Sequence, residues 1–146
     1  MIKTFTQYLN ESKYQNITLY HGTNKAFDKF NFNMAGRTDF GFLGKGFYLT
    51  ANKFLANAYA DDAASSHGGE SEVLEFNINA KKTLELDGTG LMGWNKAMKG
   101  LGIAAGSVQD QVKAVRQMGY DSIAAIFNGK IKEFVVFDDS TYRRKK

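Results

Sequence analysis

Three polar residues lie within or at the end of short apolar runs that predict β-strands. They are His21 in LYHGT, Tyr48 in GKGFYLT and Glu133 in KEFVVFD. An imidazole can hydrogen-bond a ligand, a tyrosine ring can stack on a flat group, and a carboxylate can stabilise a developing positive charge. Taken alone, His21 suits a structural hydrogen bond as well as a binding role, so the argument depends on the three residues together.

Glu133 is the least expected of the three. Pairing across the two-residue turn that precedes its strand sets it opposite Ala124, between residues that face a core. A carboxylate in an apolar interior costs several kcal/mol when it has no partner. Glu133 is therefore expected either at an open end of its strand or at a position kept for function.

Other patterns with chemical potential have simpler explanations. The run GFLGKG follows a loop and opens a strand, whereas a dinucleotide-binding glycine loop follows a strand and opens a helix. His67 lies beside two serines that lack a nucleophile elbow, so it is interpreted as a surface residue. The aspartate pairs at 61–62 and 138–139 are interpreted as solvated ends of elements.

The elements that must position these residues alternate in type along the chain. Capping residues, turn residues and apolar periodicity predict helices over 4–13, 51–64 (capped by Thr50), 91–99 and 107–118. Strands are predicted over 17–21, 46–50, 72–79, 83–86, 121–127 and 130–138, the last two forming a hairpin around Asn128-Gly129. This mixed order predicts an α+β fold. The stretch 26–44 is expected to be a long loop with aromatic anchors, and such loops are usually functional.

In order and setting, His21, Tyr48 and Glu133 resemble the His-Tyr-Glu signature of the diphtheria-toxin-like and poly(ADP-ribose)-polymerase-like ADP-ribosyltransferases. Tyr59 lies eleven residues after Tyr48, and this pair resembles the two tyrosines that sandwich nicotinamide in that family. The resemblance runs from residue 17 to 138. It implies an ADP-ribosyltransferase-like fold, with a split mixed or antiparallel β-sheet core and flanking helices. It also implies that NAD is a substrate. With two histidines and no cysteine in the chain, no metal is expected.

The resemblance assigns roles to the matching residues. Glu133 would be catalytic: it would hold the ribose 2′-hydroxyl, stabilise the oxocarbenium-like state and help to activate the acceptor. The Gly22 backbone would bind the nicotinamide carboxamide, where a side chain would block the approach. The NAD-binding residues would be His21 on the adenosine ribose, Gly22, Thr23, and Tyr48 and Tyr59 on the departing ring.

Two basic residues in and beside the long loop are further candidates for binding NAD. A guanidinium can bind phosphate in a forked geometry, so Arg37 is expected at the pyrophosphate, with Lys45 as a second ligand. An alternative interpretation, a surface arginine in a loop, stays open at this point.

Departures from the family pattern bear on the acceptor. Ala56 stands where the polymerase branch commonly has a serine, and Ile131 stands where arginine-modifying relatives have Glu or Gln. The turn ahead of Glu133 is only two residues long, which leaves little room to build a chain-elongation site. These features favour a mono-ADP-ribosyltransferase acting on a macromolecular acceptor, protein or nucleic acid. An NAD glycohydrolase, and a non-catalytic module that binds NAD, ADP-ribose or nucleic acid, are the alternatives.

Composition limits the other possibilities. A chain of 146 residues with 43% hydrophobic residues suits one domain, and the absence of cysteine excludes disulfides, thiolate nucleophiles and cysteine zinc sites. The net charge of +4 is carried entirely by the last four residues, which are expected to form a frayed basic tail. No apolar run is long enough to span a bilayer, so a cytoplasmic monomer without membrane association is expected.

The chain is divided by these criteria into residues 1–16, an N-terminal amphipathic helix, 17–142, the catalytic domain, and 143–146, the basic tail. The start, MIKTFTQYLNE, resembles proteins packaged in the heads of large tailed bacteriophages, and Leu9-Asn10-Glu11 resembles the pattern cut by prohead proteases. The resemblance implies that the chain is a small bacteriophage or bacterial member of the ADP-ribosyltransferase family. It is then expected to act in the host cytoplasm, and packaging in the virion is a further expectation. A capping amphipathic helix explains the same residues equally well.

Overall fold

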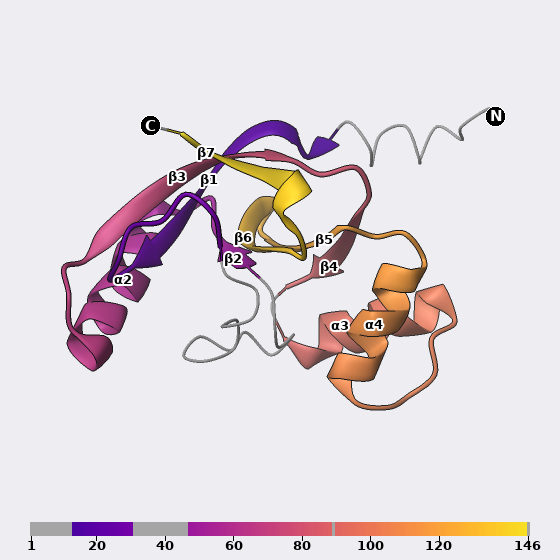
Figure 1. The fold of residues 1–146 in the computed structure, drawn as a ribbon. Helices are drawn as coiled ribbons and strands as arrows, with labels where there is room; N and C mark the ends of the chain where they lie inside the picture. The colour runs from indigo at the N-terminus through magenta and orange to yellow at the C-terminus, as the bar shows by residue number, and fades with distance from the viewer. Residues whose placement is uncertain (1–12, 31–46, 89, 146) are drawn as a thin grey trace.

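The computed structural model describes residues 13–30, 47–88 and 90–145, which form two β-sheets that share a hydrophobic core (Figure 1). The first sheet has the order β1–β3–β7 and the second β2–β6–β5–β4. The strands are β1 (Gln15–Thr23), β2 (Phe47–Leu49), β3 (Glu72–Asn79), β4 (Thr83–Asp87), β5 (Ser122–Phe127), β6 (Lys130–Val136) and β7 (Tyr142–Lys145). The helices are α2 (Lys53–His67), α3 (Leu91–Leu101) and α4 (Val108–Gln117), with a 3-10 turn, η2 (Asp139–Thr141).

Side chains alternate between the two faces of each strand, and the apolar ones on the facing sides explain why the two sheets stack. Leu19 and Phe76 from the first sheet meet Phe47 and Phe134 from the second, and all four are fully or almost fully buried. The other face of the second sheet is apolar as well and packs on α3 and α4, where Trp94 donates its indole N–H to Gln111 at 2.7 Å. The predicted α+β class is confirmed, and this arrangement is consistent with an ADP-ribosyltransferase-like fold.

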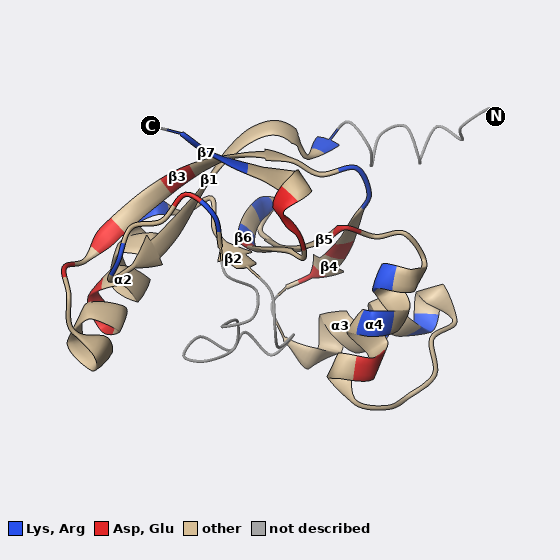
Figure 2. Ribbon diagram, in the orientation of Figure 1, with Lys and Arg blue, Asp and Glu red and all other residues tan. Residues whose placement is uncertain are grey.

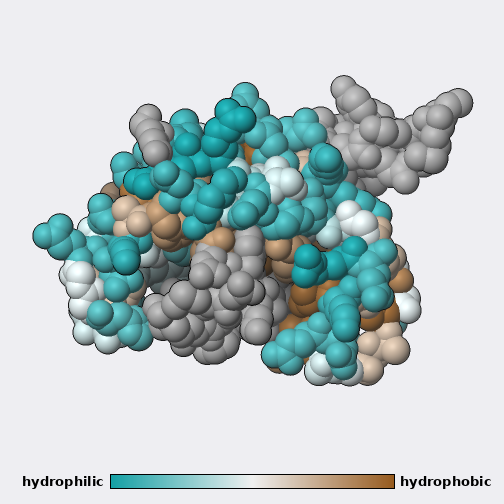
Figure 3. All heavy atoms as spheres, viewed as in Figure 1, coloured by the Kyte–Doolittle hydropathy of each residue, from teal (hydrophilic) through white to brown (hydrophobic). Residues whose placement is uncertain are grey.

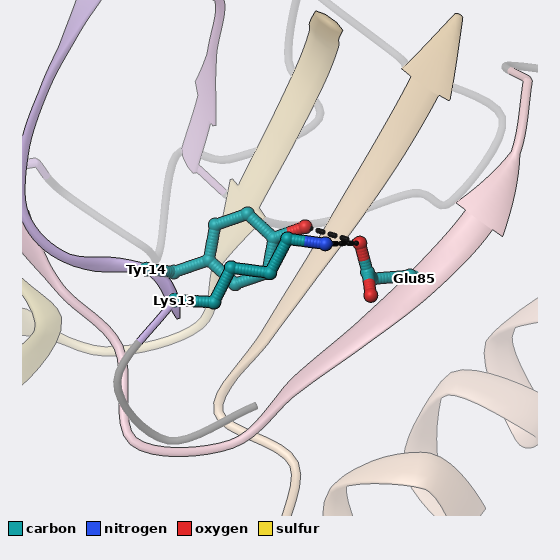
Figure 4. A network of polar contacts seen from close by, with 3 residues as sticks. All are labelled: Lys13, Tyr14 and Glu85. Atoms are coloured by element: carbon teal, nitrogen blue, oxygen red, sulfur yellow. Dashed lines mark hydrogen bonds and ion pairs between the residues drawn. The ribbon is translucent and has the colours of Figure 1, made fainter. Parts of the chain in front are cut away.

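A polar cluster joins the two sheets at the start of β1 (Figure 4). The Tyr14 hydroxyl and the Lys13 ammonium both donate to one carboxylate oxygen of Glu85 on β4, at 2.5 and 2.8 Å. Burial and the Glu85 carboxylate raise the pKa of Tyr14. Burial alone would raise the pKa of Glu85, but its two hydrogen bonds and the Lys13 charge lower it. The Glu85 carboxylate is therefore satisfied by a hydrogen bond from Tyr14 and by the charge of Lys13, and the cluster has a structural role.

Several element boundaries differ from those predicted: β1 extends over residues 15–23, β6 ends at Val136, and both ends of α2 are shifted. The N-cap of α2 is Asn52, whose side chain accepts from the backbone N–H of Phe54 and Leu55, while Thr50 accepts from Asn52 instead. The helix continues to His67, which is thus its last residue and not part of a loop. Both corrections to α2 arise because hydrogen bonding selects between neighbouring capping residues that look equivalent in sequence.

The prediction of a frayed basic tail over residues 143–146 is wrong for residues 143–145. Together with Tyr142 they form β7, which pairs antiparallel with β3. The strand lacks an apolar alternation because its inward positions are Tyr142 and Arg144, and an arginine stem can cover apolar surface. The predicted helix at 4–13, by contrast, falls almost wholly outside the described residues.

Charges of both signs are spread over the two sheets and the helices (Figure 2). The face shown in Figure 3 is mostly hydrophilic, with hydrophobic side chains visible beside α3 and α4. Within the described ranges, no helix is long and apolar enough to cross a membrane.

Candidate active site

His21 and Tyr48 are brought together where β1 meets the end of β2. Tyr20 and Thr50 exchange backbone hydrogen bonds of 2.8 and 2.9 Å, which fixes the approach of the two strands. The His21 Nδ1 atom then lies 2.8 Å from the carbonyl oxygen of Tyr48. Because a carbonyl oxygen only accepts, Nδ1 carries the proton in this contact, and this sets the tautomer of the neutral ring.

Aromatic rings surround the His21 imidazole. Phe47 meets it edge to face at a centroid distance of 4.8 Å, and Phe27 does so at 5.4 Å. Phe30 in turn stacks on Phe47 at 4.7 Å with an angle of 9° between the rings. The aromatic anchors predicted for the long loop are confirmed for Phe27 and Phe30, and the other three phenylalanines of that loop lie outside the described residues.

Tyr48 and Glu133 lie on the same face of the second sheet. Tyr48 is directly opposite Val135 in the antiparallel pair β2–β6, and Glu133 shares the face of Val135 because it is two residues away. Both side chains are half-buried. Burial raises the pKa of Tyr48, and the nearby Glu133 charge raises it further.

The predicted partner of Glu133 across the hairpin is wrong. A β-bulge separates the pairs Ile126–Ile131 and Ala125–Glu133, so Lys132 is an extra residue and Glu133 lies opposite Ala125, not Ala124. Positive φ angles at Asn128 (52°) and Gly129 (75°) confirm the predicted two-residue turn. The bulge moves Glu133 from the face between the sheets to the face that carries Tyr48.

Burial raises the pKa of the Glu133 carboxyl, and the adjacent Lys132 charge opposes this only in part. Among the described residues, no hydrogen bond or ion pair holds the carboxylate. A half-buried carboxylate of this kind has lost solvation without gaining a fixed partner, so it interacts strongly with a positive charge placed beside it.

Gly22 is required by the packing of α2 on β1. A Cβ atom at this position would lie 1.9 Å from the Ala56 carbonyl oxygen and 2.7 Å from the Ala60 backbone nitrogen. Ala56 and Ala60 are both fully buried. The Gly22 backbone thus packs directly against the backbone of α2 at Ala56 and Ala60.

The sequence matches a known family over most of its length. A family profile described as ADP-Ribosyltransferase in polyvalent proteins matches residues 15–141. The chain belongs to this family. A search of curated proteins returns no significant match. ADP-ribosyltransferases use NAD as substrate, and the family match therefore supports a transferase. In the part of the chain that the structure describes, no group of His, Asp or Glu residues is arranged to hold a metal ion.

The other residues predicted to bind NAD lie on β1 and α2 or outside the described residues. Thr23 ends β1, and its hydroxyl contacts the backbone of Lys25. Tyr59 lies on α2 next to Ala60, and its side chain is 49% exposed. Arg37 and Lys45 lie outside the described residues, so their roles stay predictions.

Sequence reasoning missed the residues of β7 that contact the segment after β1. Tyr142 and Arg144 both hydrogen-bond to this segment, which supplies two of the rings around His21. The spacing of Tyr142 and Arg144, two residues apart after the Asp-Ser-Thr turn, is the signal that could have indicated a strand with one inward face.

Proposed function

We propose that the protein is an NAD-dependent mono-ADP-ribosyltransferase of the His-Tyr-Glu class, with Glu133 as the catalytic residue. The observation that carries the proposal is the junction of β1, β2 and β6, which brings the His21 ring to the backbone carbonyl of Tyr48 and the Tyr48 side chain near Glu133. The residues proposed to bind NAD are His21, Gly22, Thr23, Tyr48 and Tyr59, with Arg37 and Lys45 at the pyrophosphate.

The chemistry matches the state of Glu133. Transfer breaks the bond between the nicotinamide nitrogen and the ribose, and the electron pair leaves with nicotinamide. The sugar acquires positive charge, which a nearby carboxylate stabilises. Because burial disfavours the charged form of Glu133, the carboxylate gains more from this cation than a solvated carboxylate would. The acceptor then bonds to the ribose carbon and releases its proton, which the carboxylate can accept.

The hairpin turn bears on the choice between products. The turn before Glu133 consists of Asn128 and Gly129 alone. This favours transfer of a single ADP-ribose to a macromolecular acceptor, protein or nucleic acid. The same short turn supports a second candidate, an NAD glycohydrolase, in which water is the acceptor. A bacterial or bacteriophage origin and action in the cytoplasm as a monomer stay predictions.

The test is incubation with NAD labelled in the adenosine half, in a bacterial lysate, with nicotinamide release and macromolecule-bound label measured together. Wild type is compared with Glu133→Gln and with Glu85→Gln, a matched change at the other Tyr–Glu pair. We expect bound label from wild type and Glu85→Gln but not from Glu133→Gln. Protease and nuclease treatment of the product then identifies the acceptor class.

The alternatives give different patterns in the same experiment. Nicotinamide release that depends on Glu133 without bound label would indicate the glycohydrolase. Activity that survives Glu133→Gln would overturn the assignment of the catalytic residue. No nicotinamide release from any of the three proteins would favour a non-catalytic binding module.

A further inference from the structure

The segment that follows β1 has no regular structure of its own over residues 24–30, yet it packs tightly at the candidate site. Its two phenylalanines lie against the His21 ring and against each other, with Phe27 and Phe30 centroids 6.0 Å apart. Because no helix or sheet hydrogen bonds hold the 24–30 segment, other hydrogen bonds must fix the position of its backbone.

The last strand supplies these hydrogen bonds. The Arg144 guanidinium donates to the carbonyl oxygen of Phe27 at 3.2 Å and to the carboxylate of Asp28 at 3.1 Å. The backbone N–H of Phe30 donates to the Tyr142 hydroxyl at 2.6 Å, and that hydroxyl donates to Asp139 at 2.5 Å. The two phenylalanines that contact His21 are therefore the two whose backbone atoms β7 holds.

The two faces of β7 differ in exposure. Tyr142 is 4% exposed and packs edge to face on Phe47, which itself contacts His21. Arg144 is half-buried, whereas Arg143 between them is exposed. The inward side of the strand is thus built to contact the 24–30 segment, and its outward side is not. Moreover, β7 follows the last residue that the family profile matches.

We propose that Tyr142 and Arg144 are positioning residues for NAD binding: they fix the backbone of Phe27 and Phe30, whose rings hold the His21 imidazole in its orientation against Tyr48. This inference rests on the proposed function, in which His21 binds NAD. The inward side of the C-terminal strand then serves the site through its hydrogen bonds to this segment.

The test measures NAD dissociation constants by calorimetry for Tyr142→Phe and Arg144→Met. Tyr142→Phe keeps the ring in the core and removes only the hydroxyl. Of the two hydrogen bonds that this hydroxyl makes, the one from the Phe30 backbone holds the segment, and its loss is expected to weaken NAD binding about three- to tenfold. Tyr14→Phe is the matched control, because it removes a buried hydroxyl bonded to a carboxylate at the far end of β1. Arg143→Met is the control for charge, and both controls should bind NAD within about twofold of wild type.

A double-mutant cycle distinguishes an effect of Tyr142 through His21 from a general loss of rigidity of the fold. If Tyr142 acts through His21, Tyr142→Phe should have no further effect on NAD binding in a His21→Ala background. The imidazole ¹⁵N shifts report the same effect without NAD: Tyr142→Phe should alter the His21 tautomer populations, and Tyr14→Phe should not.

The outcomes distinguish this inference from the function on which it rests. If His21→Ala itself leaves NAD binding intact, the proposed role of His21 fails. If His21→Ala weakens binding but Tyr142→Phe and Arg144→Met behave like their controls, the positioning role is overturned and the proposed function stands. Additive effects of Tyr142→Phe and His21→Ala would also overturn the positioning role.

Discussion

Two of the glutamates that the structure describes lie beside a tyrosine, Glu85 beside Tyr14 and Glu133 beside Tyr48, and their pKa values shift in opposite directions. At the start of β1, Glu85 accepts hydrogen bonds from Tyr14 and Lys13, which together lower its pKa. At the junction of β2 and β6, burial raises the pKa of Glu133, and no described residue hydrogen-bonds its carboxylate. Both tyrosines have raised pKa values because both are buried beside a carboxylate. The difference indicates that Glu85 is a satisfied structural group and that Glu133 is available to a ligand.

Backbone packing gives the largest expected effect, because Gly22 beside the candidate site requires a close approach of α2, whereas Gly129 in the hairpin turn meets no neighbouring atom. Gly22→Ala would drive a Cβ into the Ala56 carbonyl and should destabilise the protein by about 3 kcal/mol. Gly129→Ala, in the hairpin turn, meets no neighbouring atom and should cost about 1 kcal/mol from its positive φ alone.

Urea unfolding followed by circular dichroism checks this prediction. Equal losses of unfolding free energy for the two alanine variants would mean that α2 does not pack on β1 as closely as the structure shows.

The structural pair can be weakened without touching the candidate site. Tyr14→Phe removes the donor to Glu85 and should lower the free energy of unfolding by about 1–2 kcal/mol, since the hydrogen bond is charge-assisted. NAD turnover per folded molecule should be unchanged. A drop in turnover that exceeds the loss of folded protein would show that the Tyr14–Glu85 pair is not purely structural.

The smallest predicted effect is the pH dependence of stability, and its sign differs between the two glutamates. The raised pKa of Glu133 means that the folded state binds the Glu133 proton more tightly than the unfolded state does. The contribution of Glu133 to the free energy of unfolding is therefore present below the ordinary glutamate pKa and is lost as pH rises through the pKa of the folded state. Glu133→Gln should therefore gain stability relative to wild type as pH rises from about 4 to 7.

The lowered pKa of Glu85 gives the reverse sign. Its ionised form stabilises the fold above the ordinary glutamate pKa, and this contribution is lost as pH falls through the folded value. Glu85→Gln should thus be less stable than wild type at neutral pH and approach it in acid. Melting temperatures at a series of pH values test both glutamates, and trends of the same sign would contradict the contrast.

Local signals in the sequence predicted much of this arrangement. Asn128-Gly129 fixes a hairpin by itself, because both residues accept positive φ, and the family resemblance selected His21, Tyr48 and Glu133. The face on which Glu133 lies was not predictable in the same way. It depends on the bulge at Lys132, which arises from how β6 pairs with both of its neighbours and leaves no mark in the local pattern.

Two further features depend on contacts between distant parts of the chain. The need for glycine at position 22 comes from the backbone of α2, more than thirty residues later. The strand β7 forms because its inward side meets β3 and the 24–30 segment, although its own residues are almost all polar. Sequence patterns report local propensity and amphipathicity. They do not encode the need for glycine at position 22, and for β7 they offer no more than the spacing of Tyr142 and Arg144.

The most direct test of the central claim is the rate of NAD cleavage by purified Glu133→Gln, measured beside its NAD dissociation constant and beside Glu85→Gln. Removing one group that stabilises the transition state typically costs about 10²–10³ in rate. We predict a loss of that size for Glu133→Gln with the dissociation constant within about threefold of wild type, and a rate near that of wild type for Glu85→Gln. Equal rates for the two glutamine variants would contradict the account.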